Sequence, residues 1–307
     1  MNLNKVIRGG IKYLSDADYR FMFNAAKGKY NQIPDKEYLQ KMFRAKMGKE
    51  LDLENPQTFN EKMQWLKLYY HLPEFTVMAD KYSVRDYLAK KIGTQYSVPL
   101  LGVWDSPDQI DTDVLPNQFV LKTTHGCGGM FICRDKHEFD LEKAKKTLRG
   151  TFYKNHFNYM REWPYKDIQP RVIAEQYMQN GEERNLKVYK VLNFNGVPRI
   201  IQTIQNDKTP DESIDYFDTE WNILELRQNY PNSKVPTPRP ATLEKMLELS
   251  ATCSEGIPFL RTDWYEVNGE VFFSEFTFYS DAGMEPFYPS KWDAILGDWI
   301  TLPAKYI

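Results

Sequence analysis

A lysine followed by a glycine-rich loop is the first feature of the sequence that could do chemistry. Residues 119–133 read FVLKTTHGCGGMFIC, in which Lys122 ends an apolar run and Gly126, Gly128 and Gly129 follow it. Glycine lets a backbone approach a ligand closely and point N–H groups at an anion, and the lysine adds positive charge. The spacing is neither that of a P-loop nor that of a dinucleotide fingerprint. It predicts either a hairpin that covers phosphates or a tight turn beside a surface lysine.

Two carboxylates, Asp263 and Glu275, lie on the two arms of a second predicted hairpin, residues 261–278. A two-residue turn at Asn268-Gly269 would turn Glu275 away from Asp263, because strand residues alternate between faces. A three-residue loop that starts at Val267 and places Gly269 in a bulge brings both acids to one face. We choose the bulged register, because it gathers aromatic residues on the other face: Trp264, Phe272, Phe276 and Phe278.

In the chosen register Arg261 pairs with Glu275, and Thr277 joins them and Asp263 on the polar face. Carboxylates and a hydroxyl beside an arginine suit a hard cation such as Mg²⁺, which takes one or two carboxylates together with substrate phosphates. The same pattern is also typical of a polar sheet face with an Arg–Glu cross-strand pair. The two readings stay open at this point.

Hydrophobic periodicity predicts the elements that position these residues. Helices are expected over residues 15–30, 35–48, 60–70, 76–93, 141–157 and 242–255. Strands are expected over residues 97–104, 118–123, 130–135 and 171–178, with an antiparallel pair over 186–204 that turns at Asn195-Gly196. Residues 205–218 are expected to form a loop. The pattern indicates an α+β protein with antiparallel sheets.

Composition narrows the class of protein further. The 307 residues carry 40 basic and 42 acidic side chains, so no overall positive charge indicates nucleic-acid binding. No stretch approaches the roughly 20 apolar residues of a bilayer span, although residues 5–14 could touch a membrane surface weakly. The three cysteines show no metal-ligand spacing and no disulfide framework, which favours the reducing cytoplasm.

An ordered set of motifs resembles the TupA-like ATP-grasp family, the branch associated with teichuronopeptide biosynthesis and bacterial surface-polysaccharide genes. The resemblance covers about residues 55–300. It runs through NPQTFNEKMQWLKLYY, ADKYSVRDYLAKKIG, FVLKTTHGCGG, VIAEQYM, LKVYKVLNFNGVPRIIQ and RTDWYEVNGEVFFSEFTFYSDAG. It implies an ATP-grasp fold, in which two α+β subdomains with antiparallel sheets clamp ATP. We expect a helical N-terminal region, 1–72, a lid subdomain, 73–178, and a metal-binding subdomain, 179–307.

The resemblance also implies which residues bind the nucleotide. Lys81 and Lys122 would contact the ATP phosphates, which the backbone of Gly126, Gly128 and Gly129 would cover. The hinge strand would bind adenine through its backbone, and it comprises Glu175, Gln176, Tyr177 and Met178. Asn185 and Lys187 stand where the family usually shows an Asp-x-Lys pattern.

For catalysis, the resemblance implies that Asp263 and Glu275 hold Mg²⁺. Thr277 would be a weaker third ligand, because many ATP-grasp enzymes have Asn at that position. Arg261, together with Lys122, would steady the phosphoryl group during its transfer.

The expected activity is that of an ATP- and Mg²⁺-dependent carboxylate–amine ligase, which works through an acyl-phosphate. Its substrates would be an amine or amino acid and a uronic-acid-containing surface polysaccharide or its precursor. Two alternatives stay open: a glycosyltransferase of polysaccharide biosynthesis, and a kinase that uses the same ATP site.

Overall fold

The computed structural model describes residues 12–126, 128–181 and 186–306. Five helices occupy the first part of the chain: α2 (Ala17–Ala26), α3 (Asp35–Met47), α4 (Phe59–Tyr69), α5 (Pro73–Ala79) and α6 (Val84–Lys91). The start of α4 is fixed by a capping box, in which the Thr58 side chain accepts from the Glu61 N–H and Glu61 reaches back to the Thr58 N–H.

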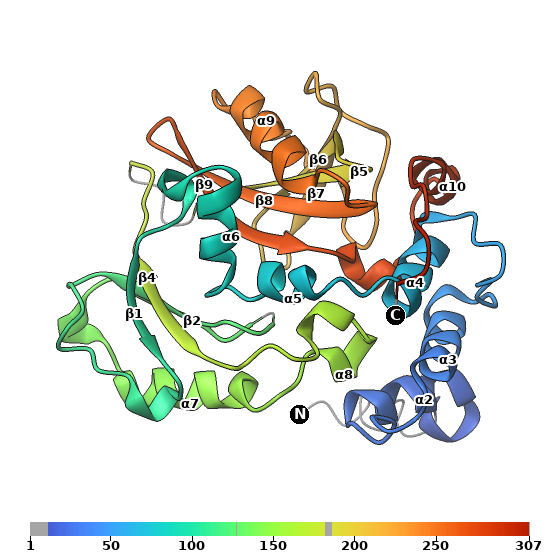
Figure 1. Cartoon of the computed structure of the whole chain (residues 1–307), viewed down its shortest axis with the longest axis horizontal. Coiled ribbons are helices and arrows are strands. Elements are labelled where there is room, and N and C mark those ends of the chain that lie inside the picture. The colour runs from blue at the N-terminus through green and yellow to red at the C-terminus, as the bar shows by residue number, and fades with distance from the viewer. Residues whose placement is uncertain (1–11, 127, 182–185, 307) are drawn as a thin grey trace.

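The small sheet has four antiparallel strands in the order β1-β4-β2-β3. Its strands are β1 (Leu100–Trp104), β2 (Phe119–Thr123), β3 (Met130–Cys133) and β4 (Val172–Gln176). Helix α7 (Leu141–Phe152) covers one face of this sheet (Figure 1). On that face Leu148 belongs to a buried core with Phe119, Leu121 and Val172. The short helix α8 (Phe157–Met160) leads from α7 towards β4.

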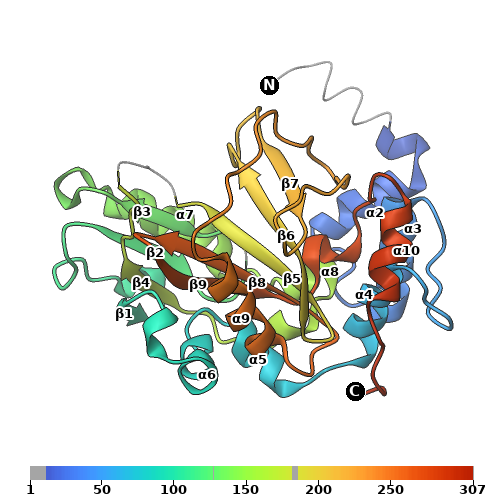
Figure 2. The same cartoon turned by 90° about the horizontal axis from the view of Figure 1, so that it is seen from above.

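The large sheet has five antiparallel strands in the order β7-β6-β5-β8-β9. Its strands are β5 (Val188–Phe194), β6 (Val197–Gln205), β7 (Ser213–Phe217), β8 (Phe259–Val267) and β9 (Glu270–Thr277). Helix α9 (Leu243–Ser254) packs on this sheet, and α10 (Lys291–Asp298) packs against α4 near the C-terminus. In Figure 2 the small sheet and the N-terminal helices lie at opposite ends, with the large sheet between them.

The N-terminal helices share a hydrophobic core with the large sheet. Tyr38 of α3 and Met63 of α4 belong to the same buried cluster as Val191, Trp264 and Phe276. The strands of the small sheet all fall within residues 73–178, and those of the large sheet fall within 179–307. The division at residues 72 and 178 stays a prediction.

The β8–β9 hairpin combines features of both registers considered from the sequence. Asn268 and Gly269 form a two-residue turn with φ of 53° and 80°, as a type I′ turn requires. The predicted three-residue loop is therefore wrong. The extra residue lies at Ser274 instead, where the register shifts so that Asp263 pairs with Glu275.

This bulge brings both carboxylates to one face, as predicted, and Arg261 pairs with Thr277 instead of Glu275. The shift also changes which phenylalanine enters the core: Phe273, paired with Trp264, is 6% exposed, whereas Phe272 is half-buried on the polar side.

Two other predicted elements differ from the structure. The helix expected over residues 76–93 is two helices, α5 and α6, because Asp80 leaves the helical conformation and accepts from the N–H groups of Tyr82 and Ser83. The loop expected over 205–218 contains β7, whose residues are all buried. The turn at Asn195-Gly196 is as predicted.

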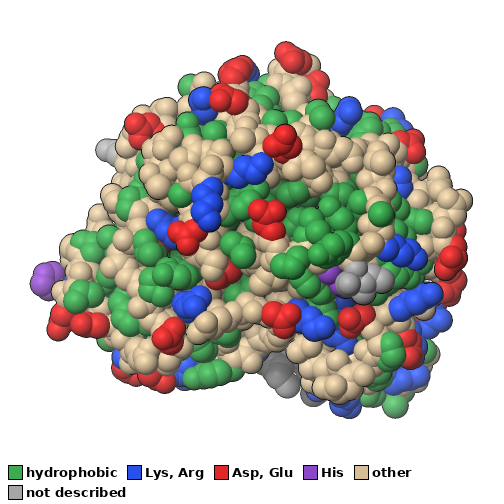
Figure 3. Space-filling view, viewed as in Figure 1, with side chains coloured by type: hydrophobic (Ala, Val, Ile, Leu, Met, Phe, Trp, Pro, Cys, Tyr) green, Lys and Arg blue, Asp and Glu red, His purple; other side chains and the backbone are tan. Residues whose placement is uncertain are grey.

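The outer surface agrees with the balanced composition. On the face shown in Figure 3, basic and acidic side chains are interspersed, with hydrophobic side chains between them. Within the part of the chain that the structure describes, no helix has the length and apolar character needed to cross a membrane.

Candidate active site

Lys122 stands near the end of β2 and forms a buried ion pair. Its Nζ lies 2.7 Å from Oε2 of Glu175 on the neighbouring strand β4, and Arg85 of α6 lies 3.6 Å from the other carboxylate oxygen. Burial opposes the charged form of Lys122, but the Glu175 carboxylate outweighs burial and raises the Lys122 pKa. Lys122 therefore stays positively charged at the inner side of the small sheet.

The glycine loop joins β2 to β3, as predicted, and its backbone is tightly placed. The Thr123 N–H donates to the Gly129 carbonyl. Gly128 and Gly129 have φ of 82° and 60°, a region that favours glycine. A Cβ at Gly129 would lie 2.4 Å from Oγ1 of Thr151 and 2.5 Å from Oγ1 of Thr123. Only glycine fits there without displacing these side chains.

Lys81 connects the glycine loop to the large sheet. It lies in the break between α5 and α6, where its N–H donates to the carbonyl of Thr124. Its Nζ donates to the Gly126 carbonyl at 3.0 Å and lies 3.4 Å from Oε2 of Glu275. The structure thus brings Lys81 into the same cluster as the loop and the acidic strand β9.

The acidic part of the site consists of two carboxylates, Asp263 and Glu275, and both are contacted by Arg261. Arg261 donates to both oxygens of Asp263, at 2.7 and 2.9 Å, and lies 3.5 Å from Oε1 of Glu275. Burial opposes the charge on Arg261, but Asp263 outweighs it and raises the Arg261 pKa. Burial also raises the pKa of Glu275, but Lys81 and Arg261 outweigh burial and lower it to about 2. Glu275 therefore carries a negative charge at neutral pH.

Lys190 on β5 is a charged neighbour that the sequence analysis missed. It pairs across strands with Asp263, and its Nζ lies 4.0 Å from Oδ2 of that residue. Burial and the positive charge of Arg261 lower its pKa. The signal was available, because Lys190 lies between the apolar residues Tyr189 and Val191, and strand alternation places it on the opposite face from them.

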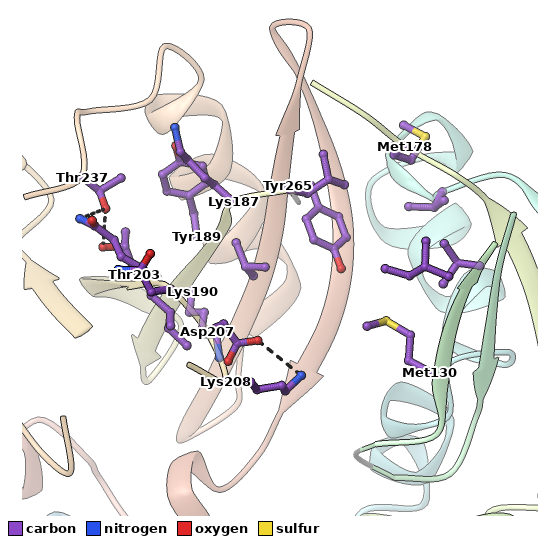
Figure 4. A pocket seen from close by; sticks show the side chains of 18 of the residues that line it. Met130, Met178, Lys187, Tyr189, Lys190, Thr203, Asp207, Lys208, Thr237 and Tyr265 are labelled. Atoms are coloured by element: carbon purple, nitrogen blue, oxygen red, sulfur yellow. Dashed lines mark hydrogen bonds and ion pairs between the residues drawn. The ribbon is translucent and has the colours of Figure 1, made fainter. Parts of the chain in front are cut away.

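A cavity of about 1090 Å³ opens between the two sheets next to this cluster (Figure 4). Figure 4 shows Met130 and Met178 on the side of the small sheet, and Tyr189 and Lys190 on the side of β5, with Tyr265 of β8 between them. Six of the predicted site residues line the cavity: Lys122, Glu175, Gln176, Tyr177, Met178 and Lys187.

The other predicted residues that the structure describes are not among those that line the cavity. Lys81 borders a small void of about 10 Å³ together with Lys122 and Glu175. Arg261, Asp263, Glu275 and Thr277 lie on β8 and β9, and Lys190 links them to the cavity, because it lines the cavity and approaches Asp263. Asn185 is outside the described residues.

The predicted hinge strand, residues 175–178, has two parts that differ in how far strand pairing occupies the backbone. The backbone of Glu175 pairs with Leu100 on one side and Val120 on the other, and the Gln176 N–H donates to the Pro99 carbonyl. Strand pairing thus occupies much of the backbone at both positions. Tyr177 and Met178 follow the end of β4, so a nucleotide base would meet their backbone first.

The two carboxylates differ in how well they fit a magnesium ion. Both oxygens of Asp263 are engaged by Arg261, and the residue is 2% exposed. The Glu275 side chain is 36% exposed, and its two ionic contacts are long. The described residues hold no group of three or more His, Cys, Asp or Glu arranged as a metal site. The partly exposed carboxylate of Glu275 fits a Mg²⁺ ion that nucleotide phosphates would also coordinate. The metal roles of Asp263, Glu275 and Thr277 all stay predictions.

Comparison with solved structures gives low similarity throughout. The D-alanine–D-alanine ligase from Bacillus anthracis complexed with ATP is 14% identical, with a TM-score of 0.39 over 66% of this chain and 53% of that chain. A second structure of the Bacillus anthracis enzyme is 14% identical, with a TM-score of 0.42 over 93% and 92% of the two chains. The chain thus spans about half the length of the first of these structures.

The D-alanine–D-alanine ligase from Helicobacter pylori is 14% identical, with a TM-score of 0.41 over 80% of this chain and 70% of that chain. A search among curated proteins finds no match.

The family comparison is more specific. The model described as TupA-like ATPgrasp matches residues 61–301, which is most of the chain. The α+β architecture with two antiparallel sheets agrees with the expected fold class, which is confirmed. The chain belongs to the TupA-like ATP-grasp family.

Proposed function

We propose that the protein is an ATP-dependent ligase that joins a carboxylate to an amine through an acyl-phosphate. The observation that carries this proposal is a group of four cationic side chains beside a nucleotide-sized cavity, of which two contact Glu275, one pairs with Glu175 and one approaches Asp263. The four are Lys81, Lys122, Lys190 and Arg261. Cavities of roughly 300–1,000 Å³ hold small molecules and cofactors, so this one has room for a nucleotide.

The cavity walls support an orientation for ATP. The apolar side chains of Val120, Met130 and Ile132 line the small-sheet wall, near the end of the hinge at Met178, and suit a purine ring. Two positively charged side chains, Lys122 and Lys190, also line the cavity and suit the phosphates. The γ-phosphate would then lie near Arg261.

The proposed reaction has two balanced steps. First, a carboxylate oxygen attacks the γ-phosphorus, the bond from phosphorus to the bridging oxygen breaks, and ADP leaves with an acyl-phosphate formed. Second, the amine lone pair attacks the acyl carbon, a C–N bond forms, inorganic phosphate leaves, and the nitrogen loses a proton.

The residues of this chain contribute mainly electrostatics. Lysine and arginine side chains fixed near the transferring group stabilise its charge without reorganisation. Asp263 orients Arg261 through its two hydrogen bonds. When bound, Mg²⁺ would neutralise further phosphate charge, and Glu275 is the residue best placed to hold it.

The substrate part of the proposal is a uronic-acid-containing surface polysaccharide, or its precursor, as the carboxylate, and an amino acid or small amine as the nucleophile. It is supported by membership of a family associated with surface-polysaccharide genes. Cytoplasmic location belongs to the same proposal.

The proposal is tested by measuring ADP and phosphate release by the purified protein. A ligase releases both, and the release depends on a carboxylate and an amine together. A kinase releases ADP while the phosphate stays on the acceptor, and a glycosyltransferase consumes a sugar nucleotide instead of ATP. Either of these two results would replace the proposed activity.

A further inference from the structure

Arg85 on α6 is a half-buried cation whose guanidinium has two different partners. Its Nη2 donates to the Val98 carbonyl at 2.7 Å, which ties α6 to the segment before β1. Its Nη1 lies 3.6 Å from Oε1 of Glu175, and Lys122 holds the other oxygen of that carboxylate at 2.7 Å. The Glu175 carboxylate is therefore shared between two cations.

The shared carboxylate lies at the wall of the nucleotide cavity, and Arg85 lies behind that wall. Arg85, Lys122 and Glu175 all border the small void of about 10 Å³, which Phe273 and Ser274 of β9 border from the large sheet. Lys122 and Glu175 also line the nucleotide cavity, whereas Arg85 is not among its lining residues. Arg85 can therefore act on a ligand in the cavity only through its charge or through Glu175.

The charges of these three side chains decide what the wall offers to an anion. Lys122 and Glu175 alone would form a neutral pair, whose attraction for a phosphate largely cancels. Arg85 adds a second positive charge, and arginine stays protonated in proteins. Among the residues that the structure describes, neither Arg85 nor Lys122 has another carboxylate within 4.0 Å. The group of three thus carries one positive charge in excess.

We propose that Arg85 is a positioning residue that neutralises Glu175, so that the charge of Lys122 is available to the nucleotide phosphates. This inference rests on the proposed function and deepens it, because it names a further residue on which phosphate binding depends. A purely structural role, in which Arg85 only holds Val98, leads to a different expectation. In that case the charge of Glu175 would have no influence on the effect of losing Arg85.

The test measures the affinity of a non-hydrolysable ATP analogue with Mg²⁺ by titration calorimetry. Adenosine, which has no phosphates, is the second probe. The unmodified protein is compared with four variants: Arg85→Met, Arg85→Lys, the double variant Arg85→Met, Glu175→Gln, and the control Lys91→Met. Glutamine at position 175 keeps an oxygen that accepts from Lys122. Lys91 lies on the same helix, but it pairs with the exposed Glu255 at 3.2 Å.

We expect Arg85→Met to weaken binding of the ATP analogue by roughly tenfold, the order that Coulomb's law gives for one unit charge near a phosphate in a protein. Adenosine affinity should not change. Arg85→Lys should keep most of the affinity for the analogue, because it keeps the charge. The double variant should regain most of the loss, because the negative charge of Glu175 is removed as well. Lys91→Met should bind both probes as the unmodified protein does.

A further variant keeps the test decisive if Arg85→Met fails to fold. Glu175→Gln alone leaves both cations in place and should bind the ATP analogue more tightly than the unmodified protein does. Equal or weaker binding by this variant would overturn the inference.

The inference is also overturned if Arg85→Met binds the analogue as tightly as the unmodified protein. A double variant that binds as weakly as Arg85→Met would assign Arg85 a purely structural role at Val98. Failure of the proposed function gives a different result, because the unmodified protein would then not bind the analogue at all. An unmodified protein that binds the analogue, with an affinity that does not depend on Arg85, contradicts only this inference.

Discussion

The small sheet and the large sheet each place a buried cation beside a carboxylate, but they use the pair differently. On the small sheet, Lys122 and Glu175 are 14% and 11% exposed and lie 2.7 Å apart, so each charge is matched. On the large sheet, Arg261 matches Asp263 and leaves Glu275 with long contacts and 36% exposure. The small sheet therefore supplies fixed positive charge, while the large sheet leaves one carboxylate, that of Glu275, partly exposed for a ligand.

The most damaging change should be Lys122→Ala, because it breaks the matched pair. Turnover of ATP should fall by about 10²–10³-fold, the usual effect of removing one fixed electrostatic group. The free energy of unfolding should also fall by about 3 kcal/mol, since Glu175 stays buried with only Arg85 near it. ADP release and thermal unfolding measure the two effects.

The double variant Lys122→Ala, Glu175→Gln is the matched control for this change. The Glu175→Gln change removes the negative charge that Lys122→Ala leaves without its lysine partner. The double variant should therefore regain much of the free energy of unfolding but none of the ATP turnover. A double variant as unstable as Lys122→Ala would show that the Lys122–Glu175 pair is not the source of the loss.

The second prediction concerns Glu275→Gln, which tests the available carboxylate. Turnover should again fall by about 10²–10³-fold if Glu275 contacts the metal and phosphates. Thermal melting should change little, because the side chain is partly exposed and its ionic contacts are long. Loss of fold together with activity would mean that Glu275 is a structural residue.

The third prediction is that acid lowers the stability of the protein through His156, which lies next to the glycine loop of the small sheet. Burial, followed by the charge of Lys81, lowers the pKa of His156 to about 4, and a Cβ at Gly126 would lie 3.2 Å from this histidine. The unfolded chain takes up the proton near pH 6.5. The contribution of His156 to stability is therefore complete above pH 6.5 and is lost as the pH falls from 6.5 to about 4.

Melting temperatures measured between pH 7.5 and 4 check this effect. The protein with His156→Gln should lose less stability over that range than the unmodified protein. Identical pH profiles would show that other groups cause the acid sensitivity.

The smallest effects are expected in the glycine loop. Gly128→Ala should cost about 1 kcal/mol, because φ is 82° but the nearest atom to an added Cβ is 3.7 Å away. Gly129→Ala should cost more, because its Cβ would collide with Thr123 and Thr151. Chemical unfolding compares the two variants, and equal costs would show that the tight loop geometry does not hold in solution.

The sequence predicted the main strands and the shared face of the two acids because alternation and turn residues are local signals. Asn195-Gly196 and Asn268-Gly269 both specify two-residue hairpin turns. The bulge at Ser274 could not be predicted, because it depends on how β9 packs against β8 and the core. The prediction that Asp263 and Glu275 share one face was correct although the predicted loop length was wrong. A three-residue loop and a bulge in the strand each insert one residue into the hairpin, so both have the same effect on the faces.

The site was predicted less completely than the fold. Lys81 was assigned to a helix, whereas the break at Asp80 turns it towards Gly126 and Glu275. Lys190 was missed although strand alternation gave a local signal for it, because its role depends on its approach to Asp263, which lies far away in the sequence.

The most direct test of the central claim is a crystal structure with a non-hydrolysable ATP analogue and Mg²⁺. We expect the purine between the sheets beside Tyr177 and Met178, and the phosphates within hydrogen-bond distance of Lys81 or Lys122, on the side of Glu275. A nucleotide bound elsewhere, or phosphates that contact neither lysine, would contradict the claim that the two sheets form one phosphate-transfer site.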